Sequence, residues 1–154
     1  MAFWVWEKTP YVRLQTQNTK NRGDTVGVMA IAQVLAVTVD CHDPALLAVF
    51  WRELVGGEID TRTESDDWVA LRDVPVIGNI GFQKVPEGKR VKNRVHLDVE
   101  VDDIEEATPR VIALGATDSG ATVDESTGQF RVFHDPEGNE FCLIRRRLQP
   151  SLPY

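Results

Sequence analysis

Two successive segments of this chain carry the same order of predicted elements, and this repeat limits the folds that the chain can adopt. In residues 33–85 and again in residues 91–146, a strand pattern leads through an aspartate into an amphipathic helical pattern that ends at a glycine, and three short β-like stretches follow. We therefore predict an α+β fold built from two βαβββ modules. Two half-sheets that face one another can form a cleft for a small ligand.

The first module shows clear signals at both ends of its helix. A strand with alternating apolar residues spans 35–40, Asp43 is suited to the N-cap, and Pro44 stands at the first helical position, where its missing N–H costs no hydrogen bond. Gly56 supplies the left-handed stop. Three strands are expected near residues 58–62, 68–72 and 77–84.

The second module opens with strict alternation over residues 91–101, which predicts one long strand. The polar face of this strand carries Lys92, Arg94, His96, Asp98 and Glu100. Asp103 is suited to cap the next helix, and Pro109 should kink that helix or delay its start to Thr108. Further strands are expected near residues 117–123, 129–134 and 140–145, the last two joined by the turn sequence Asp135-Pro136-Glu137-Gly138-Asn139.

The segments outside the repeat carry weaker signals. Residues 1–28 form an N-terminal extension, residues 29–148 the folded domain, and residues 149–154 a C-terminal tail. The extension lacks the basic start and the apolar stretch of about 7–15 residues that mark a secretory signal. Trp4 and Trp6 leave two interpretations open: the fold does not need the extension, or these side chains dock on the domain or on a partner subunit.

Composition argues against several function classes. The chain of 154 residues carries a net charge of −7, which argues against nucleic acid or anionic lipid as partners, because Lys and Arg supply most of the affinity for phosphates. Its apolar runs are all shorter than the roughly 18 residues that cross a bilayer, so no membrane partner is expected. Cys41 and Cys142 form neither a CxxC metal pair nor a disulfide scaffold, so we expect reduced thiols in a cytoplasmic protein.

Two residues of the second module could act on one cleft. His96 and Glu140 stand on matching strands, and an imidazole nitrogen and a carboxylate oxygen are acceptable ligands for zinc, iron, manganese or nickel. Gln83 could add a third oxygen, and Asp98 or water could complete the site. The opposing interpretation is structural: His96 hydrogen-bonds within a polar strand face, and Glu140 only leaves a turn.

The corresponding positions of the first module are poorer in metal ligands. When the modules are aligned on the aspartates that open their helices, Ala36 falls opposite His96 and cannot coordinate a metal. Glu140 falls opposite Gly81 or Gln83. The chain has no dinucleotide fingerprint, Walker loop or serine-hydrolase elbow, so nucleotide-dependent and serine-hydrolase functions lack support.

Other residues near this face have two interpretations each. Arg94 could bind an anionic substrate or pair with a neighbouring carboxylate. Trp68 and Phe82 could line the cleft and contact a ligand. Cys142 is interpreted as a small apolar filler and not as a nucleophile, since the sequence shows no basic neighbour for it.

Four motifs together resemble the glyoxalase, bleomycin-resistance and ring-cleaving dioxygenase group, called the vicinal oxygen chelate superfamily. They are Val37-Thr-Val-Asp-Cys-His-Asp-Pro44, Gly81-Phe-Gln-Lys-Val-Pro86, Asn93-Arg-Val-His-Leu-Asp98 and His134-Asp-Pro-Glu-Gly-Asn-Glu-Phe-Cys-Leu-Ile144. The likeness extends from about residue 33 to residue 145. Within the superfamily, the chain looks most like the glyoxalase-like proteins of actinobacteria.

The resemblance implies paired βαβββ modules whose curved mixed sheets enclose a cleft, and it implies a homodimer. It also implies a divalent metal in active members, with His96 matching the fifth-strand ligand, Glu140 the eighth-strand ligand and Gln83 the nearest candidate on the fourth strand. Ala36 occupies the first-strand position, where glyoxalase I usually has His or Gln. In isomerising members a carboxylate ligand doubles as general base, a role that would fall to Glu140.

Three hypotheses for function follow. The first is an enzyme of the lyase, isomerase or dioxygenase type that acts on a small oxygen-rich metabolite through a divalent metal at His96 and Glu140. The second is a protein that sequesters a small molecule without chemistry, as bleomycin-resistance proteins do, which Ala36 favours. The third is a partner domain with a decayed site. The sequence leaves open whether the chain is an enzyme.

Overall fold

The structure is a computed structural model that describes residues 31–62 and 65–147. The chain divides into two compact units, residues 1–32 and 33–154, and every element described below belongs to the second unit. The predicted extension 1–28 and tail 149–154 lie outside the described residues. Neither helix of the described part is long and apolar enough to cross a membrane.

The first βαβββ module forms a four-stranded sheet with one helix. Its elements are β1 (Val37–Cys41), α1 (Pro44–Val55), β2 (Glu58–Ile59), β3 (Trp68–Val74) and β4 (Gly78–Lys84). The strand order is β1-β4-β3-β2, with β1 parallel to β4 and the other neighbours antiparallel. The predicted N-cap is present, because the Asp43 carboxylate accepts a hydrogen bond from the N–H of Leu46 at 3.0 Å.

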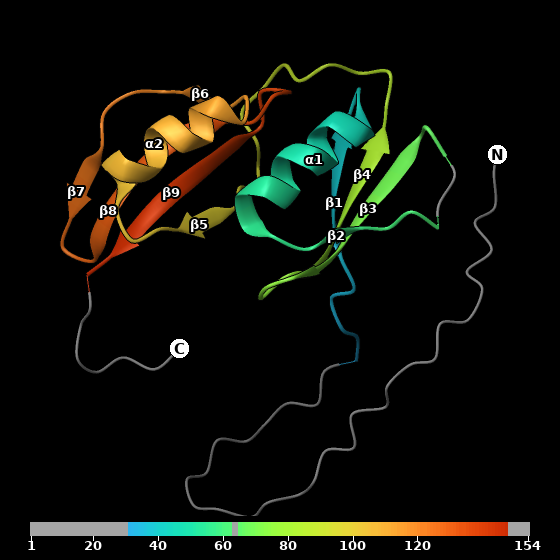
Figure 1. Ribbon diagram of the computed structural model, residues 1–154, viewed down its shortest axis with the longest axis horizontal. Coiled ribbons are helices and arrows are strands. Elements are labelled where there is room, and N and C mark those ends of the chain that lie inside the picture. The colour runs from blue at the N-terminus through green and yellow to red at the C-terminus, as the bar shows by residue number, and fades with distance from the viewer. Residues whose placement is uncertain (1–30, 63–64, 148–154) are drawn as a thin grey trace, which may run out of the picture. The chain divides into compact units, whose positions relative to one another are not determined.

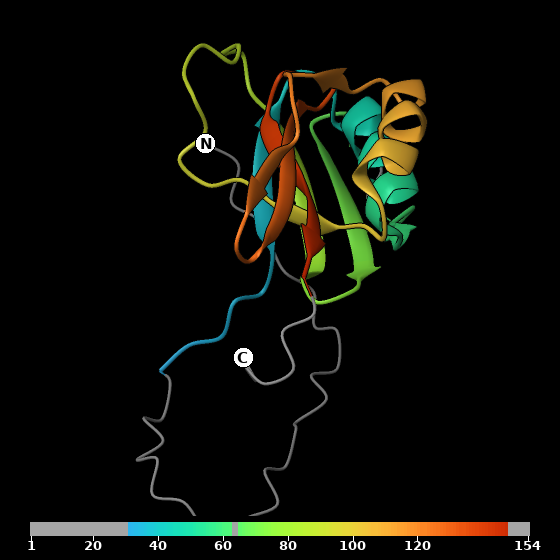
Figure 2. The same ribbon diagram turned by 90° about the vertical axis from the view of Figure 1, so that its left-hand side faces the viewer.

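The second module repeats this pairing pattern. Its elements are β5 (Asp98–Glu100), α2 (Ile104–Ala113), β6 (Thr117–Asp118), β7 (Val123–Glu125), β8 (Gly128–His134) and β9 (Glu140–Arg146). The strand order is β5-β9-β8-β6, with β7 also paired to β8, and β5 runs parallel to β9. Figure 1 shows each helix with its own sheet, and Figure 2 shows both helices on the same side of the strands. The predicted α+β fold of two modules is confirmed.

The first strand of the second module is shorter than predicted. Alternation predicts a strand over residues 91–101, but β5 contains only residues 98–100, and residues 91–97 are irregular. The physical reason lies in the partner strand, which begins only at Glu140. The N–H of Asn93 donates to the Glu140 carboxylate at 3.0 Å in place of a strand carbonyl.

The second helix begins earlier than its proline predicts. Helix α2 starts at Ile104, so the prediction that Pro109 delays the start to Thr108 is wrong. The Asp103 carboxylate caps the helix by accepting a hydrogen bond from the N–H of Glu105 at 2.9 Å. This cap favours a start well before the proline.

The predicted strand over residues 117–123 is two short strands, β6 and β7. The Asp118 carboxylate accepts a hydrogen bond from the N–H of Gly120 at 3.0 Å and so forms a turn directly after β6. Gly120 has a φ of 146°, which a residue with a Cβ rarely adopts. The turn therefore interrupts the strand.

The two modules share one hydrophobic core. Phe50 and Trp51 of α1 pack edge-to-face against Phe141 of β9, with ring centroids 5.9 and 5.4 Å apart. Phe133 of β8 stacks on Phe141, with ring centroids 5.7 Å apart. Aromatic rings from the first module's helix thus pack on the second module's sheet.

The loop between β8 and β9 adds a polar link between the modules. Asp135 is only 2% exposed, and its carboxylate accepts hydrogen bonds from the N–H groups of Glu137 and Asn139, both at 2.9 Å. The Glu137 carboxylate in turn accepts hydrogen bonds from the backbone N–H groups of His42 and Asp43 at 2.7 and 2.6 Å. These groups precede α1, where the helix dipole favours negative charge.

Candidate functional site

A pocket of about 1210 Å³ lies between the two modules. Its wall consists of β1, the segment 85–97 and the loop that leads into β9. The segment 85–97, yellow-green in Figure 2, extends on the side of the strands away from the helices. Three predicted site residues, His96, Glu140 and Arg94, line this one pocket.

Glu140 is held by two groups on the pocket wall. Its carboxylate lies 3.0 Å from the Lys89 ammonium and accepts the hydrogen bond from the N–H of Asn93 at 3.0 Å. Burial alone would raise the pKa of Glu140, but the N–H of Asn93 and the Lys89 ammonium outweigh it and lower the pKa to about 2. A carboxylate with so low a pKa is a poor proton acceptor near neutral pH.

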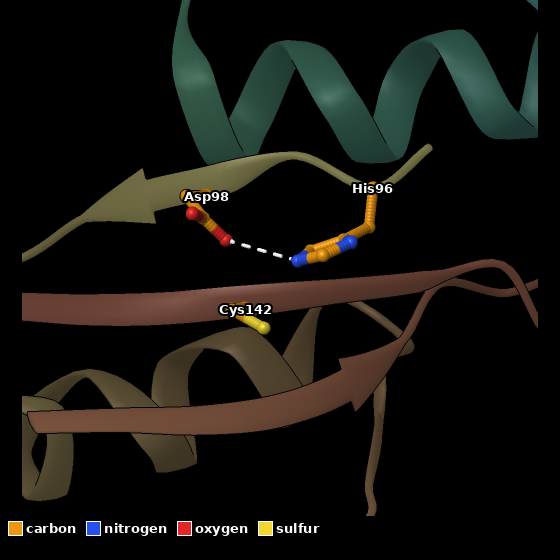
Figure 3. A group of neighbouring side chains, drawn as sticks. All are labelled: His96, Asp98 and Cys142. Carbon is orange, nitrogen blue, oxygen red and sulfur yellow. Dashed lines mark ion pairs between the residues drawn. The ribbon is translucent and has the colours of Figure 1, made fainter. Parts of the chain in front are cut away.

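His96 lies in a compact group of donor atoms. Its Nε2 atom is 3.4 Å from Oδ1 of Asp98, and the sulfur of Cys142 lies within 4.8 Å of both. Figure 3 shows the imidazole and the carboxylate pointing toward each other, with Cys142 on the neighbouring strand. Nitrogen, oxygen and sulfur from one small volume are a donor set that suits a divalent metal. The residues present therefore fit the divalent metal that the resemblance to the superfamily implies.

The two cysteines differ in their surroundings. Burial raises the pKa of Cys142, and the nearby Asp98 carboxylate raises it further. Burial, followed by the charge of Glu137, raises the pKa of Cys41 to about 12. The Cys41 thiol donates a long hydrogen bond, 3.5 Å, to the carbonyl of Gln83. Only Cys142 belongs to a group of metal-ligating side chains within the described residues.

The remaining predicted site residues lie away from the pocket. Phe82 is 0% exposed in the core, so the structure gives it a packing role in place of the predicted ligand contact. Gln83 is exposed on β4 and does not line the pocket. Trp68 also lies outside the pocket wall, with its indole over Gly81.

Strand register shows which residues of the two modules correspond. Thr38 pairs with Gly81 in the first module, and Asp98 pairs with Cys142 at the equivalent place in the second. This correspondence follows when the capping aspartates of the two helices are aligned. The first module therefore offers neither a carboxylate nor a thiol where the second offers both.

The same alignment of the two modules changes the counterpart of Glu140. Glu140 lies two residues before Cys142, and Asn79 lies two residues before Gly81. Glu140 therefore corresponds to Asn79 and not to Gln83, the predicted fourth-strand ligand. The Asn79 amide donates a hydrogen bond to the carbonyl of Leu35 at 3.2 Å. Register therefore gives the position equivalent to Glu140 to an amide that is bonded to the backbone and not to Gln83.

Sequence reasoning missed Cys142 and gave Asp98 only a reserve role. Alternation places His96 and Asp98 on one face, and it places Glu140 and Cys142 on one face of the last strand. The missing information was the parallel register that sets Asp98 directly opposite Cys142. Register between distant strands depends on tertiary packing, which alternation within one strand does not specify.

Comparison with known proteins agrees with this architecture. A family model described as a glyoxalase-like domain matches residues 36–144, more than half of the chain. The chain belongs to the glyoxalase-like domain family. The predicted place in the vicinal oxygen chelate superfamily is thereby confirmed. No curated protein matches the chain.

Solved structures of the same superfamily resemble this glyoxalase-like chain in fold. A glyoxalase/bleomycin resistance protein/dioxygenase family enzyme from Burkholderia phytofirmans is 21% identical, with a TM-score of 0.63, over 75% of this chain and 100% of that one. The fosfomycin resistance protein FosX from Listeria monocytogenes is 16% identical, with a TM-score of 0.62, over 77% and 96%. A mutant of FosX, also 16% identical with a TM-score of 0.62 over 78% and 94%, was solved with Mn(II) and 1S,2S-dihydroxypropylphosphonic acid.

Proposed function

We propose that this glyoxalase-like protein binds a small oxygen-rich metabolite in the pocket between its modules and transforms it with the help of a divalent metal, as a lyase, an isomerase or a dioxygenase. The observation that carries the proposal is that His96 and Glu140 line the same pocket. Relatives with this fold include a fosfomycin resistance protein solved with Mn(II) and a small phosphonic acid.

The residues of the pocket divide the work as follows. His96 supplies an imidazole ligand, and Glu140 supplies a carboxylate whose charge is balanced by the Lys89 ammonium, so a metal cation can take the place of that ammonium. The metal, when bound, polarises the oxygens of the substrate. The apolar side chains of Val37, Val39 and Leu97 on the wall limit water near the substrate.

Arg94 is the proposed contact for the substrate. It lines the pocket and forms no ion pair with a described residue, so its guanidinium is free to bind anionic oxygens. Glu140 is assigned to metal binding in preference to base catalysis, because its pKa of about 2 disfavours proton transfer near neutral pH.

Metal analysis of protein purified without chelator tests this proposal. We expect close to one divalent metal per chain in the wild type, and loss of that metal in His96→Ala and Glu140→Gln. His42→Ala and Glu100→Gln are matched controls, because both residues lie outside the pocket wall. A wild-type chain without metal, even after incubation with zinc, iron, manganese or nickel salts, contradicts the proposal.

The second candidate is sequestration of a small molecule without chemistry. The Lys89–Glu140 ion pair favours it, since it neutralises the pocket carboxylate without a metal. Ala36 also favours it, because it offers no donor at the first-strand position. Calorimetric titration of aromatic ligands with excess chelator discriminates the two: tight binding there, with no metal in the wild type, supports sequestration.

We propose a homodimer because the resemblance to the superfamily implies one. Light scattering after size-exclusion chromatography measures the mass directly. A mass of one chain at micromolar concentration contradicts the dimer and leaves the pocket, which lies within one chain, unaffected.

A further inference from the structure

We infer that His96, Asp98 and Cys142 together bind the metal, so that the metal of this chain is held by a thiolate and belongs to the zinc class. This inference rests on the proposed function, because it concerns the metal bound at His96, and it gives the other ligand positions to Asp98 and Cys142 in place of Glu140. It replaces the ligand that the first strand lacks at Ala36 with two donors from the second module.

The spacing of the donor atoms supports a tetrahedral site. Metal–ligand distances of about 2.0–2.3 Å place neighbouring ligands of a tetrahedral metal roughly 3.3–3.7 Å apart. Nε2 of His96 and Oδ1 of Asp98 already stand 3.4 Å apart. The sulfur of Cys142 lies within 4.8 Å of both, so it needs to move by only roughly 1 Å to complete the set.

Strand pairing fixes the backbone that carries two of these side chains, Asp98 and Cys142, and His96 lies in the irregular segment that leads into β5. Asp98 lies directly opposite Cys142 in the parallel pair of β5 and β9, and the N–H of Cys142 donates to the carbonyl of Leu97 at 2.9 Å. Ligands on paired strands hold their separation better than ligands on loops. His96 lies two residues before Asp98, and their side chains point toward each other (Figure 3).

The burial of the three donors gives the site one open side. Cys142 is 7% exposed, whereas the side chains of His96 and Asp98 are about half exposed, and His96 lines the pocket. Three protein ligands with one position left for water or substrate are the arrangement of catalytic zinc sites. A substrate in the pocket can therefore reach the metal from the side of His96.

The thiol decides which metal the site prefers. Binding releases the thiol proton to solvent, and the resulting thiolate is a soft ligand that favours zinc over manganese or magnesium. The Lys92 ammonium attracts the thiolate and repels a bound cation, but its side chain is exposed and can turn to solvent. Glu140 can keep its contacts with Lys89 and Asn93 in this arrangement.

Cobalt substitution tests the inference without any substrate. The full-length protein is stripped of metal, loaded with Co(II) or Zn(II), and studied by absorption spectroscopy and by metal analysis. We expect one metal per chain and a near-ultraviolet band from charge transfer between thiolate and Co(II). Cys142→Ser should abolish the band and weaken zinc binding by tenfold or more, and Asp98→Asn should weaken zinc binding by a similar factor.

Matched variants separate loss of a ligand from loss of the fold. Cys41→Ser removes the other buried thiol and should leave the band and the zinc affinity unchanged. Glu100→Gln removes a neighbouring carboxylate of β5 and should also leave them unchanged. Thermal unfolding of Cys142→Ser and Cys142→Ala without metal measures whether the fold survives, and we expect cooperative transitions like that of the wild type.

The outcomes distinguish this inference from the proposed function. Metal that binds without a thiolate band, survives Cys142→Ser and is lost in His96→Ala and Glu140→Gln overturns the thiolate site and leaves the proposed function intact. Absence of bound metal in the wild type overturns both. A band that survives Cys142→Ser but disappears in Cys41→Ser also overturns the inference.

Discussion

The two modules have the same strand pairings but place different chemistry on their open faces. In the first module the indole of Trp68 covers Gly81, and a Cβ added at that glycine would lie 2.3 Å from the indole ring. In the second module the equivalent residue is Cys142, opposite Asp98 and beside His96. The repeated backbone preserves positions, while the side chains on it separate into a packed face and a ligand-bearing face.

The turns between the last two strands of each module also differ. In the second module Asp135 accepts hydrogen bonds from the N–H groups of Glu137 and Asn139, and Gly138 takes the positive φ of 86°. In the first module the equivalent turn places Val76 at a φ of 70°, which is unfavourable for a β-branched residue. The turn beside the pocket is therefore well supported, whereas the turn away from it is strained.

The largest expected effect comes from the supported turn. Asp135→Asn removes the charge that holds two backbone N–H groups in a buried position, so we expect a loss of about 2–4 kcal/mol in the free energy of unfolding. Urea denaturation followed by circular dichroism measures it. Asp73→Asn, at an exposed residue of β3 close to the corresponding turn of the first module, is the matched control and should cost less than about 0.5 kcal/mol. Equal costs at the two positions would remove the difference between the turns.

The packed face of the first module gives the next largest effect. Gly81→Ala forces the indole of Trp68 to move, because the new Cβ would lie 2.3 and 2.5 Å from ring carbons, and we expect a cost of about 1–3 kcal/mol. Cys142→Ala at the equivalent position has no such neighbour to displace. In a Trp68→Ala background the cost of Gly81→Ala should disappear, which a double-mutant cycle measures. An unchanged cost in that background would show that the glycine is needed for its backbone and not for the indole.

In both modules an ion pair between a carboxylate and an arginine links a short edge strand to its neighbour, and the two carboxylates differ in exposure. Asp60, with a side chain 6% exposed, bonds Arg62 and Arg72, whereas Asp118, at 23%, bonds Arg131. Hydrogen bonds from Arg62 outweigh burial and hold the pKa of Asp60 well below its usual range. We expect Asp60→Asn to cost about 1–2 kcal/mol at pH 7, and Asp118→Asn to cost less.

The sign of the pH dependence follows from the lowered pKa of Asp60. Its folded-state pKa is below its unfolded value, so its contribution is complete above about pH 4 and is lost as the pH falls below that value. The difference between wild type and Asp60→Asn should therefore shrink between pH 5 and pH 2 in denaturation experiments. A difference that stays constant over this range would show that hydrogen bonding, and not charge, stabilises the strand.

The smallest expected effect is a gain in stability at the strained turn. The N–H of Ile77 donates to the carbonyl of Pro75 at 2.8 Å, which closes a three-residue turn around Val76. Val76 is fully exposed, so Val76→Gly relieves the backbone without loss of packing and should stabilise the protein by about 0.5–1 kcal/mol. Val95→Gly, at an exposed residue without a positive φ, should give no gain. Thermal unfolding compares the two, and equal shifts would argue against strain at Val76.

Most of the fold was predictable from local signals in the sequence. Asp43 and Asp103 cap the helices where their patterns begin, and the turn signal from Asp135 to Asn139 joins two paired strands. The strand over residues 91–101 was overpredicted because alternation cannot show that the partner strand begins only at Glu140. Local patterns specify elements, whereas their length depends on neighbours.

The candidate site was predictable only in part, because its residues meet through tertiary packing. Alternation placed His96 on a polar face, and the structure adds that Glu140 lines the same pocket. Phe82 could not be assigned to the core from sequence, because the choice of face depends on which side the helix covers. The same limit applied to Gln83 and Cys142, whose places depend on strand register.

The hydrogen bonds that Glu137 accepts make the two halves of the molecule depend on each other. A carboxylate from the second half occupies the amide groups ahead of the first half's helix, and the aromatic rings of both halves interlock. Either half expressed alone would leave those amides and rings facing water. We therefore expect that neither half folds as an independent protein, although each half contains a complete sheet and helix.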